Sequence, residues 1–318
     1  MAITRIFYTT DLHGSERVFI KFLNAAKMYK ANVVIMGGDM TGKMIVPIVK
    51  LNENTFTSKL LGTEVIAKDK TELEKLENNI RYNGFYPYYT EPQEMQELNK
   101  DQTKVDALFE KLMAETLKRW IGIGEERLKD LQAKVYMTPG NDDSFAIDEV
   151  LNSSRTIVNP EGKVVMIDDH HEMISSGYSN ATPWDSPREA SEEGLEKKIE
   201  SMASEVKDMK NCVFNFHCPP YNSGIDVAPR LGKDLKPMVS PGTGVEMIPV
   251  GSTSVRKMIE KYQPLMGLHG HIHEAKGETK IGRTICYNPG SEYGEGVLRG
   301  IIVNIDEKGV KSRLFVSG

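Results

Sequence analysis

The stretch Leu268-His269-Gly270-His271-Ile272-His273 carries three histidines at alternate positions. In extended backbone the side chains at i and i+2 lie on one face, so alternate imidazoles can reach a common centre. Neutral imidazole binds borderline transition metals. A His-x-His pattern alone is weak evidence, because surface and core histidines are common. Its interpretation as a metal site therefore depends on partners elsewhere in the chain.

Four further motifs supply such partners. Each offers oxygen or nitrogen ligands at a point where an apolar, strand-like run gives way to a loop. They are Asp11-Leu12-His13, Gly37-Gly38-Asp39, Gly140-Asn141-Asp142-Asp143 and Phe216-His217. Five ligand motifs in one chain are not readily produced by chance. The sequence therefore predicts a metal site at the ends of strands.

The composition is that of an ordinary globular protein. The 318 residues, 39% hydrophobic and 27% charged, suffice for one large α/β domain or a domain with a substantial insertion. The net charge of −5 gives no overall attraction to nucleic acid or to an anionic membrane. A local basic groove would still permit a nucleic-acid substrate, so this class is not indicated but stays open.

The cysteines and the N-terminus favour a reducing compartment. Cys212, Cys218 and Cys286 are odd in number and lack CxxC spacing, so we interpret them as small buried residues. The sequence has no stretch of roughly 20 apolar residues, and residues 1–10 lack a signal-peptide pattern. We therefore expect a cytoplasmic protein without a membrane partner.

The first 39 residues predict a βαβ unit. Residues 5–10 are rich in β-branched and aromatic residues, 15–29 show helical spacing of apolar residues, and 33–36 form a continuous apolar run. Such a run is typical of a parallel strand buried on both faces. Both expected strands end at acidic residues, so the chemistry is expected at their carboxyl edge.

Regular patterning lapses between about residues 43 and 134. A hairpin around residues 52–54 and two amphipathic helices are expected there. Five aromatic residues within 82–89 are interpreted as a packed cluster, with a lid or substrate-binding wall as the alternative.

Beyond residue 134 the patterns predict further alternating elements. We expect strands at 135–138, 164–167, 173–174 and 212–216, and helices from the capping box Ser186-Pro187-Arg188-Glu189 toward Met209 and at 253–262. The Pro- and Gly-rich residues 219–251 predict a long loop, and 284–287 and 300–305 closing strands of a second sheet.

The candidate ligands comprise two carboxylates, one amide oxygen and four imidazoles. These are too many for one catalytic ion with an open position, but they fit two divalent ions about 3.5–4 Å apart. Asp39 is the expected bridge, because its neighbouring glycines leave space for both ions. The residual positive charge would attract a phosphate ester, and a bound water of lowered pKa would supply the nucleophile. We expect Mn²⁺ first, with Fe, Zn²⁺ or Ni²⁺ as alternatives.

The same five motifs resemble those of the calcineurin-like metallophosphoesterases. Residues 177–193, 217–221 and 288–291 also resemble the microbial branch of predicted phosphoesterases related to cyclic-nucleotide phosphodiesterases. The resemblance implies an α/β fold, a four-layer αββα sandwich of two mixed β-sheets flanked by helices. It implies one metallophosphoesterase domain over 1–318, with a hairpin-plus-helical insertion at about 43–134.

The resemblance also implies ligand sets, carried over motif by motif. The first ion would be held by Asp11, His13, Asp39 and His273, and the second by Asp39, Asn141, His217 and His271. Asn141 and His217 would also act in catalysis, together with Asp142. The family often has His at the Asp142 position, as the expected acid for the leaving group, so acid catalysis differs here. His269 is expected to support the fold or the ligands rather than to bind metal.

These observations predict a two-metal-dependent phosphohydrolase, with a phosphodiesterase preferred, that uses a metal-bridging hydroxide for in-line attack on a small phosphate ester. The alternatives are a phosphomonoesterase or nucleotide phosphatase, and a non-catalytic metal-binding scaffold of the same fold. The oligomeric state cannot be predicted from these patterns.

Overall fold

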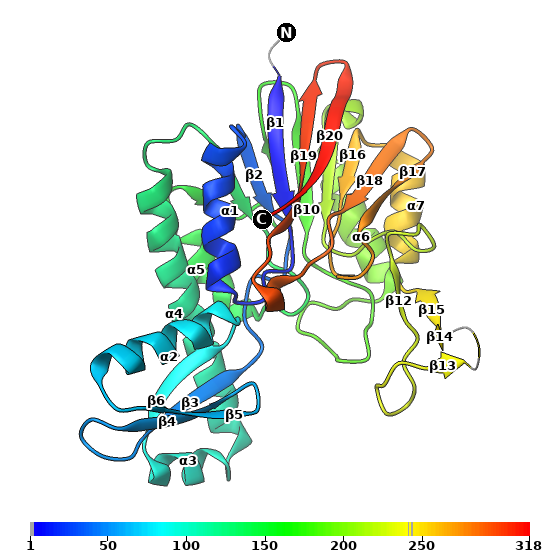
Figure 1. Ribbon diagram of the computed structural model, residues 1–318. Helices are drawn as coiled ribbons and strands as arrows, with labels where there is room; N and C mark the ends of the chain where they lie inside the picture. The colour runs from blue at the N-terminus through cyan, green and yellow to red at the C-terminus, as the bar shows by residue number, and fades with distance from the viewer. Residues whose placement is uncertain (1–2, 241, 243) are drawn as a thin grey trace.

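Two six-stranded sheets pack face to face at the centre of the computed structural model, which describes residues 3–240, 242 and 244–318 (Figure 1). The first sheet has the order β20-β19-β1-β2-β7-β8 and the second β17-β18-β16-β11-β10-β9. The first contains β1 (Thr4–Thr9), β2 (Val33–Met36), β7 (Lys134–Met137), β8 (Ile157–Val158), β19 (Arg299–Asp306) and β20 (Gly309–Ser317). The second contains β9 (Val164–Met166), β10 (Glu172–Ser176), β11 (Cys212–Phe216), β16 (Met266–Leu268), β17 (Gly277–Ile281) and β18 (Thr284–Asn288).

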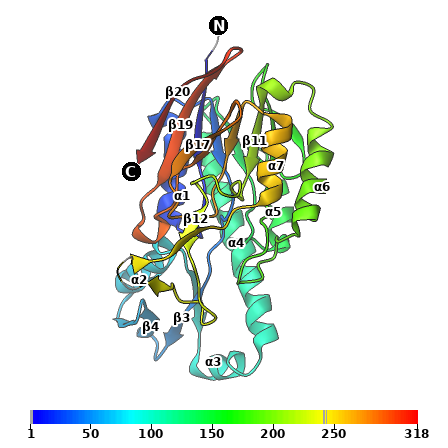
Figure 2. The ribbon, with the colours of Figure 1, turned by 90° about the vertical axis from the view of Figure 1, so that its right-hand side faces the viewer.

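Both sheets are mixed, and helices cover their outer faces (Figures 1 and 2). The first sheet is covered by α1 (Glu16–Met28), α4 (Gln102–Leu128) and α5 (Asp148–Asn152). The second is covered by α6 (Glu192–Ala203) and α7 (Thr253–Tyr262). The predicted four-layer αββα sandwich is therefore confirmed, and so is the predicted helix at 253–262.

The apolar alternation of the strands explains how the layers form. On β1, Ile6 and Tyr8 lie in the cluster between the two sheets, whereas Phe7 packs against the helical layer. All four residues of β2 are buried, as expected for a strand covered on both faces. Parallel pairing of β1 with β2 and of β2 with β7 brings their carboxyl ends to one edge.

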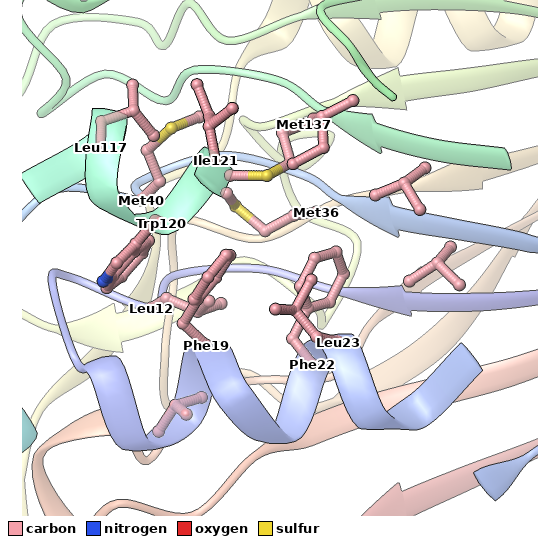
Figure 3. Packing of buried hydrophobic residues seen from close by; sticks show 14 of the residues in the cluster. Leu12, Phe19, Phe22, Leu23, Met36, Met40, Leu117, Trp120, Ile121 and Met137 are labelled. Carbon is pink, nitrogen blue, oxygen red and sulfur yellow. The ribbon is translucent and has the colours of Figure 1, made fainter. Parts of the chain in front are cut away.

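A cluster of buried side chains holds α1 and α4 on the first sheet (Figure 3). Phe19 of α1 stacks on Trp120 of α4 with ring centroids 4.1 Å apart and an interplanar angle of 6°. Such a pair contributes about 0.5–1.5 kcal/mol beyond its buried area. The C-terminal half of α4 therefore packs in the helical layer of the sandwich, although its sequence lies within the predicted insertion.

Residues 45–98 form a separate region below the sandwich in Figure 1, which we call the outer sheet region. Its sheet has the order β5-β4-β3-β6 and packs on α2 through its own apolar cluster. The elements are β3 (Ile45–Lys50), β4 (Phe56–Leu60), β5 (Thr63–Ala67), α2 (Lys70–Tyr82), β6 (Tyr86–Thr90) and α3 (Pro92–Leu98). The expected hairpin is β3–β4, and the aromatic run supplies β6.

Three predictions about connections and pairing were wrong. Residues 300–305 belong to β19, which pairs antiparallel with β1 in the first sheet rather than in the second. Apolar residues on β19 pack in the core between the two sheets. The apolar pattern indicates that this strand is buried but not which of the two sheets it joins. The predicted loop 219–251 contains short strands, namely β12 (Val227–Pro229), β13 (Val239–Ser240), β14 (Gly244–Val245) and β15 (Met247–Pro249).

The third concerns the capping box at Ser186, which forms but does not begin a helix. The Glu189 carboxylate accepts hydrogen bonds from the backbone N–H groups of Ser186 and Thr182. Residues Arg188 and Ala190 meanwhile pair with Ser179, which holds this backbone in a loop. The helix begins instead at Glu192, with Ser191 as its N-cap.

Among the residues that the structure describes, no helix is both long and apolar enough to cross a membrane. The three cysteines are buried, as predicted.

Candidate metal centre

The seven predicted ligands meet where five strands of the two sheets end. Loops after β1, β2, β7, β11 and β16 deliver them. Six of their side chains form two groups, in each of which the ligand atoms lie within 4.8 Å of one another. The first group is Asp11, His13 and His273, and the second is Asp39, His217 and His271. The two histidines after β16 are partly exposed, and the other members of both groups are buried.

Asp39 of the second group also lies close to the first group. Its Oδ2 is 3.6 Å from His13 Nε2 and 3.4 Å from His217 Nε2. On the other side of the site, His13 Nε2 and His273 Nε2 are 3.1 Å apart. Asp11 Oδ1 lies 3.3 Å from His273 Nε2 and 3.8 Å from His217 Nε2. Both carboxylates thus face imidazoles of both groups, which is the placement a bridging ligand needs, and Asp39 approaches the opposite group more closely than Asp11 does.

Asn141 presents its oxygen to the second group. Its Nδ2 donates to Ser186 Oγ at 2.9 Å, which turns the amide so that Oδ1 lies 3.1 Å from His217 Nε2. The loop also requires glycine at position 140, because a Cβ there would lie 2.1 Å from Asp39 Oδ1. The same loop that carries Asn141 therefore packs against Asp39.

Four of the seven residues have left-handed backbone conformations. The φ angles are 56° for Asp11, 41° for His13, 51° for Asp39 and 66° for His271. Non-glycine residues rarely adopt such angles, and each costs about 1–3 kcal/mol. The surrounding hydrogen bonds maintain the strain, as when the backbone N–H of His271 donates to the Asp11 carboxylate. Strain concentrated on converging polar residues is typical of functional sites.

The charges of the site are strongly coupled. Burial would lower the pKa of His217, but the carboxylates of Asp39 and Asp11 raise it to about 10. Burial lowers the pKa of His13 to about 3 and that of His271 to about 4, so these rings are neutral near pH 7. Burial opposes ionisation of Asp39, yet the nearby histidines hold its pKa well below its usual range. Anionic carboxylates and neutral imidazoles are the protonation states that metal ligands require, and His217 would release its proton when an ion binds.

The donor set fits two divalent ions. Each group offers carboxylate oxygen and imidazole nitrogen at close range, and Asn141 adds an amide oxygen to the second. In addition, the buried Nδ1 of His13 has no hydrogen-bond partner among the described residues, while its Nε2 points to the other ligands. The residues that could hold the ions include the predicted ones, and His13, Asp39 and Asp142 form a third group whose ligand atoms lie within 4.8 Å of one another.

Supporting residues fix the ligand loops. His217 Nδ1–H donates to the carbonyl oxygen of Gly37 at 3.0 Å. His269 lies outside the ligand groups, with its Nδ1 2.9 Å from the Phe216 carbonyl oxygen, so it pins the segment that carries His217. The Asp143 carboxylate accepts hydrogen bonds from the backbone N–H groups of residues 40, 41 and 140. Such supporting contacts orient metal ligands.

Asp142 lies at the rim, where it pairs with a residue that the motifs did not indicate. Lys43 Nζ is 2.6 Å from Asp142 Oδ2, and the side chains are 49% and 25% exposed. Burial and the charge of Asp39 raise the pKa of Asp142, and the Lys43 ammonium opposes them. The only sequence signal for Lys43 is its position four residues after Asp39, beyond Gly42.

Tyr293 is a second rim residue that sequence reasoning missed. Its ring lies 4.6 Å from the His13 ring and 5.8 Å from the His273 ring, measured between centroids. Beside it a cavity of about 410 Å³ opens from His273 along Ser291 and is lined by the charged residues Glu274, Lys276, Glu292 and Arg299. The metal centre thus has an adjoining space that these charged side chains line together with Pro289 and Gly290.

Comparisons with known proteins place the chain among relatives. No protein-family model matches it. The uncharacterized protein MJ1162 of Methanocaldococcus jannaschii is 35% identical over 168 residues, which cover 52% of this chain and 68% of MJ1162. The crystal structure of TT1561 from Thermus thermophilus aligns with a TM-score of 0.54 at 13% identity, over 100% of this chain and 99% of that one. Another crystal structure aligns with a TM-score of 0.58 at 17% identity, over 99% of both chains.

Proposed function

The chain belongs to the family of MJ1162 and has the fold of the calcineurin-like metallophosphoesterases, and on this premise we propose that it is a two-metal-dependent phosphohydrolase. The observation that carries the proposal is the pair of ligand groups, in which the Asp39 carboxylate of the second group also faces His13 of the first. Small phosphate esters are the proposed substrates, with diesters preferred to monoesters.

Two ions bound there would supply Lewis acidity, which lowers the pKa of a water molecule and offsets charge on a phosphate. The proposed ligands of the first ion are Asp11, His13, Asp39 and His273, and those of the second are Asp39, Asn141, His217 and His271. Mn²⁺ is the ion to test first. Asp11 and Asp39 cancel only part of the charge of two dications, so the site would retain an attraction for anionic phosphate.

The remaining roles concern the substrate. Asn141 and His217 lie side by side at the base of the site, where they would hold the phosphate as well as an ion. The cavity beside His273 would receive the organic group of the ester. Its charged lining suits a polar group better than a lipid chain. Asp142 at the rim forms an ion pair with Lys43, which favours its ionised form and makes it a poor proton donor, so the departing oxygen would need another source of stabilisation.

The test combines metal analysis with turnover. Protein loaded with Mn²⁺ is expected to bind two ions per chain and to hydrolyse bis-p-nitrophenyl phosphate faster than p-nitrophenyl phosphate. Faster hydrolysis of the monoester would contradict the diester preference but not the reaction class. Binding of two ions without turnover of any ester in a broad metabolite panel would contradict the enzyme and support a metal-binding scaffold.

A further inference from the structure

The Lys43–Asp142 ion pair lies at the rim of the metal centre. Its cation, Lys43, comes from a segment outside the two sheets of the sandwich. Lys43 follows the Asp39 loop directly and precedes β3, so its backbone belongs to the junction with the outer sheet region. A hydrogen bond from the Gly42 backbone N–H to the Tyr86 hydroxyl, at 2.6 Å, fixes this junction. Asp142 is held on its own side, because its backbone N–H donates to Asp39 Oδ1 at 3.0 Å.

The exposure of the pair sets how firmly Lys43 is held. With the lysine 49% exposed, the ion pair contributes at most about 1 kcal/mol to stability. The buried His217–Asp39 pair cannot open without leaving a charge unpaired, but Lys43 can exchange a carboxylate oxygen for another anionic oxygen at little cost. Its four-carbon side chain is flexible and carries a compact point charge. Asp142 therefore holds Lys43 at the rim by a weak ion pair that an anionic oxygen can replace.

The direction of phosphoryl transfer makes this position chemically useful. The attacking and departing oxygens lie roughly in line across the phosphorus. The proposed ligand atoms converge at the base of the site, so an oxygen departing away from them faces the rim. The side chains of Lys43, Asp142 and Tyr293 lie near the rim. An ionised carboxylate repels a developing anion, whereas an ammonium stabilises it.

We propose that Lys43 is a catalytic residue that stabilises the departing oxygen of the ester, and that Asp142 is the residue that positions it. This inference rests on the proposed function. It accounts for a carboxylate at the rim of an anion-binding site, because the carboxylate acts through the lysine. It also extends the substrate class to esters of ordinary alcohols, whose oxygens leave with substantial negative charge.

The experiment compares Lys43→Met and Lys43→Arg with the same change at a second exposed lysine nearby in the sequence. Lys50, at the far end of β3, is exposed and forms no ion pair with any residue in the described part of the chain. Lys50→Met is therefore the control for loss of a surface charge. All variants are first checked for unchanged melting temperature and for the same metal content as the wild type.

The first readout is a series of aryl phosphodiesters of graded leaving-group pKa. The wild type and Lys50→Met are expected to show a shallow dependence of kcat on leaving-group pKa. In Lys43→Met the dependence steepens, with a loss of about 100-fold for the poorest leaving group, as for removal of one oxyanion donor, and less than about tenfold for p-nitrophenolate. Lys43→Arg restores part of the rate, and Asp142→Asn shows a smaller steepening.

The second readout does not depend on turnover. Orthovanadate can adopt a five-coordinate form with an oxygen at the departing position, and its affinity is measured by titration calorimetry. Lys43→Met should weaken it at least tenfold, and Lys50→Met should not change it. If the wild type is active and Lys43→Met has the same slope and the same vanadate affinity as the wild type, this inference is overturned while the proposed function stands. Steepening in Tyr293→Phe instead would overturn it in favour of the tyrosine. A metal-loaded wild type inactive on every ester would overturn the proposed function itself.

Discussion

The sandwich and the outer sheet region use acidic side chains for different purposes. In the sandwich, carboxylates and imidazoles at strand ends converge within 4.8 Å, and four of these residues have strained backbone. In the outer sheet region the polar side chains pair locally near the surface. The Tyr88 hydroxyl donates to Glu94, the Tyr89 hydroxyl to Glu77, and Glu77 also pairs with Arg81.

The difference shows what converts a polar residue into a functional one. Exposed pairs contribute roughly 0–1 kcal/mol each and are satisfied by one another. The buried groups are assembled against the cost of desolvation, like-charge repulsion and strain, which the exposed pairs do not meet. Chemistry thus requires convergence and burial in addition to the right residue types.

The largest expected effect comes from changing a carboxylate to an amide in the sandwich, compared with the same change in the outer sheet region. Asp39→Asn should lose ester hydrolysis by about 1,000-fold or more and weaken both ions, since losing even a supporting residue costs about 10–100-fold. Glu77→Gln, between Tyr89 and Arg81, should change stability by less than about 1 kcal/mol and leave activity unchanged. Kinetics and metal titration measure activity and ion binding in both variants, and denaturant unfolding measures the stability of Glu77→Gln. Retention of two ions at unchanged affinity in Asp39→Asn would show that Asp39 does not bridge.

The next effect tests how tightly the ligand loops are packed. In Gly140→Ala the new Cβ would lie 2.2 Å from the Asp39 backbone nitrogen and 2.1 Å from its Oδ1, so Asp39 must move. We expect a loss of about 3 kcal/mol in unfolding free energy, with impaired metal binding. Gly122→Ala on α4 has open space within 4 Å and should stabilise the helix by about 0.5–1 kcal/mol. Denaturant unfolding measures the change in unfolding free energy of each variant. Equal changes in Gly140→Ala and Gly122→Ala would show that the loop at Gly140 is not packed more tightly than the helix surface at Gly122.

A smaller effect concerns the dependence of stability on pH. Burial raises the pKa of Glu161 in the sandwich from 4.5 to about 7, against a hydrogen bond from the Gly177 N–H. Between these values the folded chain keeps a proton that the unfolded chain releases, so stability should fall as pH rises from about 4.5 to 7. Glu161→Gln removes this decline and should gain roughly 1–2 kcal/mol relative to the wild type by pH 8.

The control for that pH effect is Glu94 in the outer sheet region. Hydrogen bonds from Tyr88 and Thr90 lower its pKa, so its contribution has the opposite sign and is lost as pH falls. Glu94→Gln should therefore leave the decline above pH 4.5 in place. An unchanged pH profile in Glu161→Gln would show that this carboxyl group does not titrate in that range.

The site was more predictable than its surroundings, for a physical reason. Metal ligands must be specific residue types at strand ends, so Asp11, Asp39 and His271 are visible as short motifs. Pairing is set by contacts distant in sequence, so the assignment of β19 to a sheet could not be predicted. Capping chemistry was also ambiguous, because the Glu189 carboxylate satisfies a loop as well as a helix. Lys43 was missed because its role depends on the side chain of Asp142, which is distant in sequence.

The aromatic run of residues 82–89 gives the smallest expected effect and the sharpest test of whether the outer sheet region touches substrate. Tyr86 is only 2% exposed, and its hydroxyl accepts the Gly42 N–H, so Tyr86→Phe should cost about 1 kcal/mol of stability. The Tyr88 and Tyr89 hydroxyls are already bound to Glu94 and Glu77, which favours packing over a substrate wall.

Replacing Tyr88 and Tyr89 by Phe should therefore change KM less than about twofold, because their hydroxyls contact Glu94 and Glu77 rather than substrate, and should cost only roughly 0.5 kcal/mol of stability for each exposed hydrogen bond lost. The measurement compares KM for a small aryl phosphodiester with KM for a bulky one, alongside melting temperatures. If the packing interpretation holds, both substrates respond alike, and Tyr86→Phe shows the larger drop in melting temperature. A rise in KM confined to the bulky substrate would place these tyrosines at the substrate. The outer sheet region would then contribute to recognition through β6 as well as through the junction that carries Lys43.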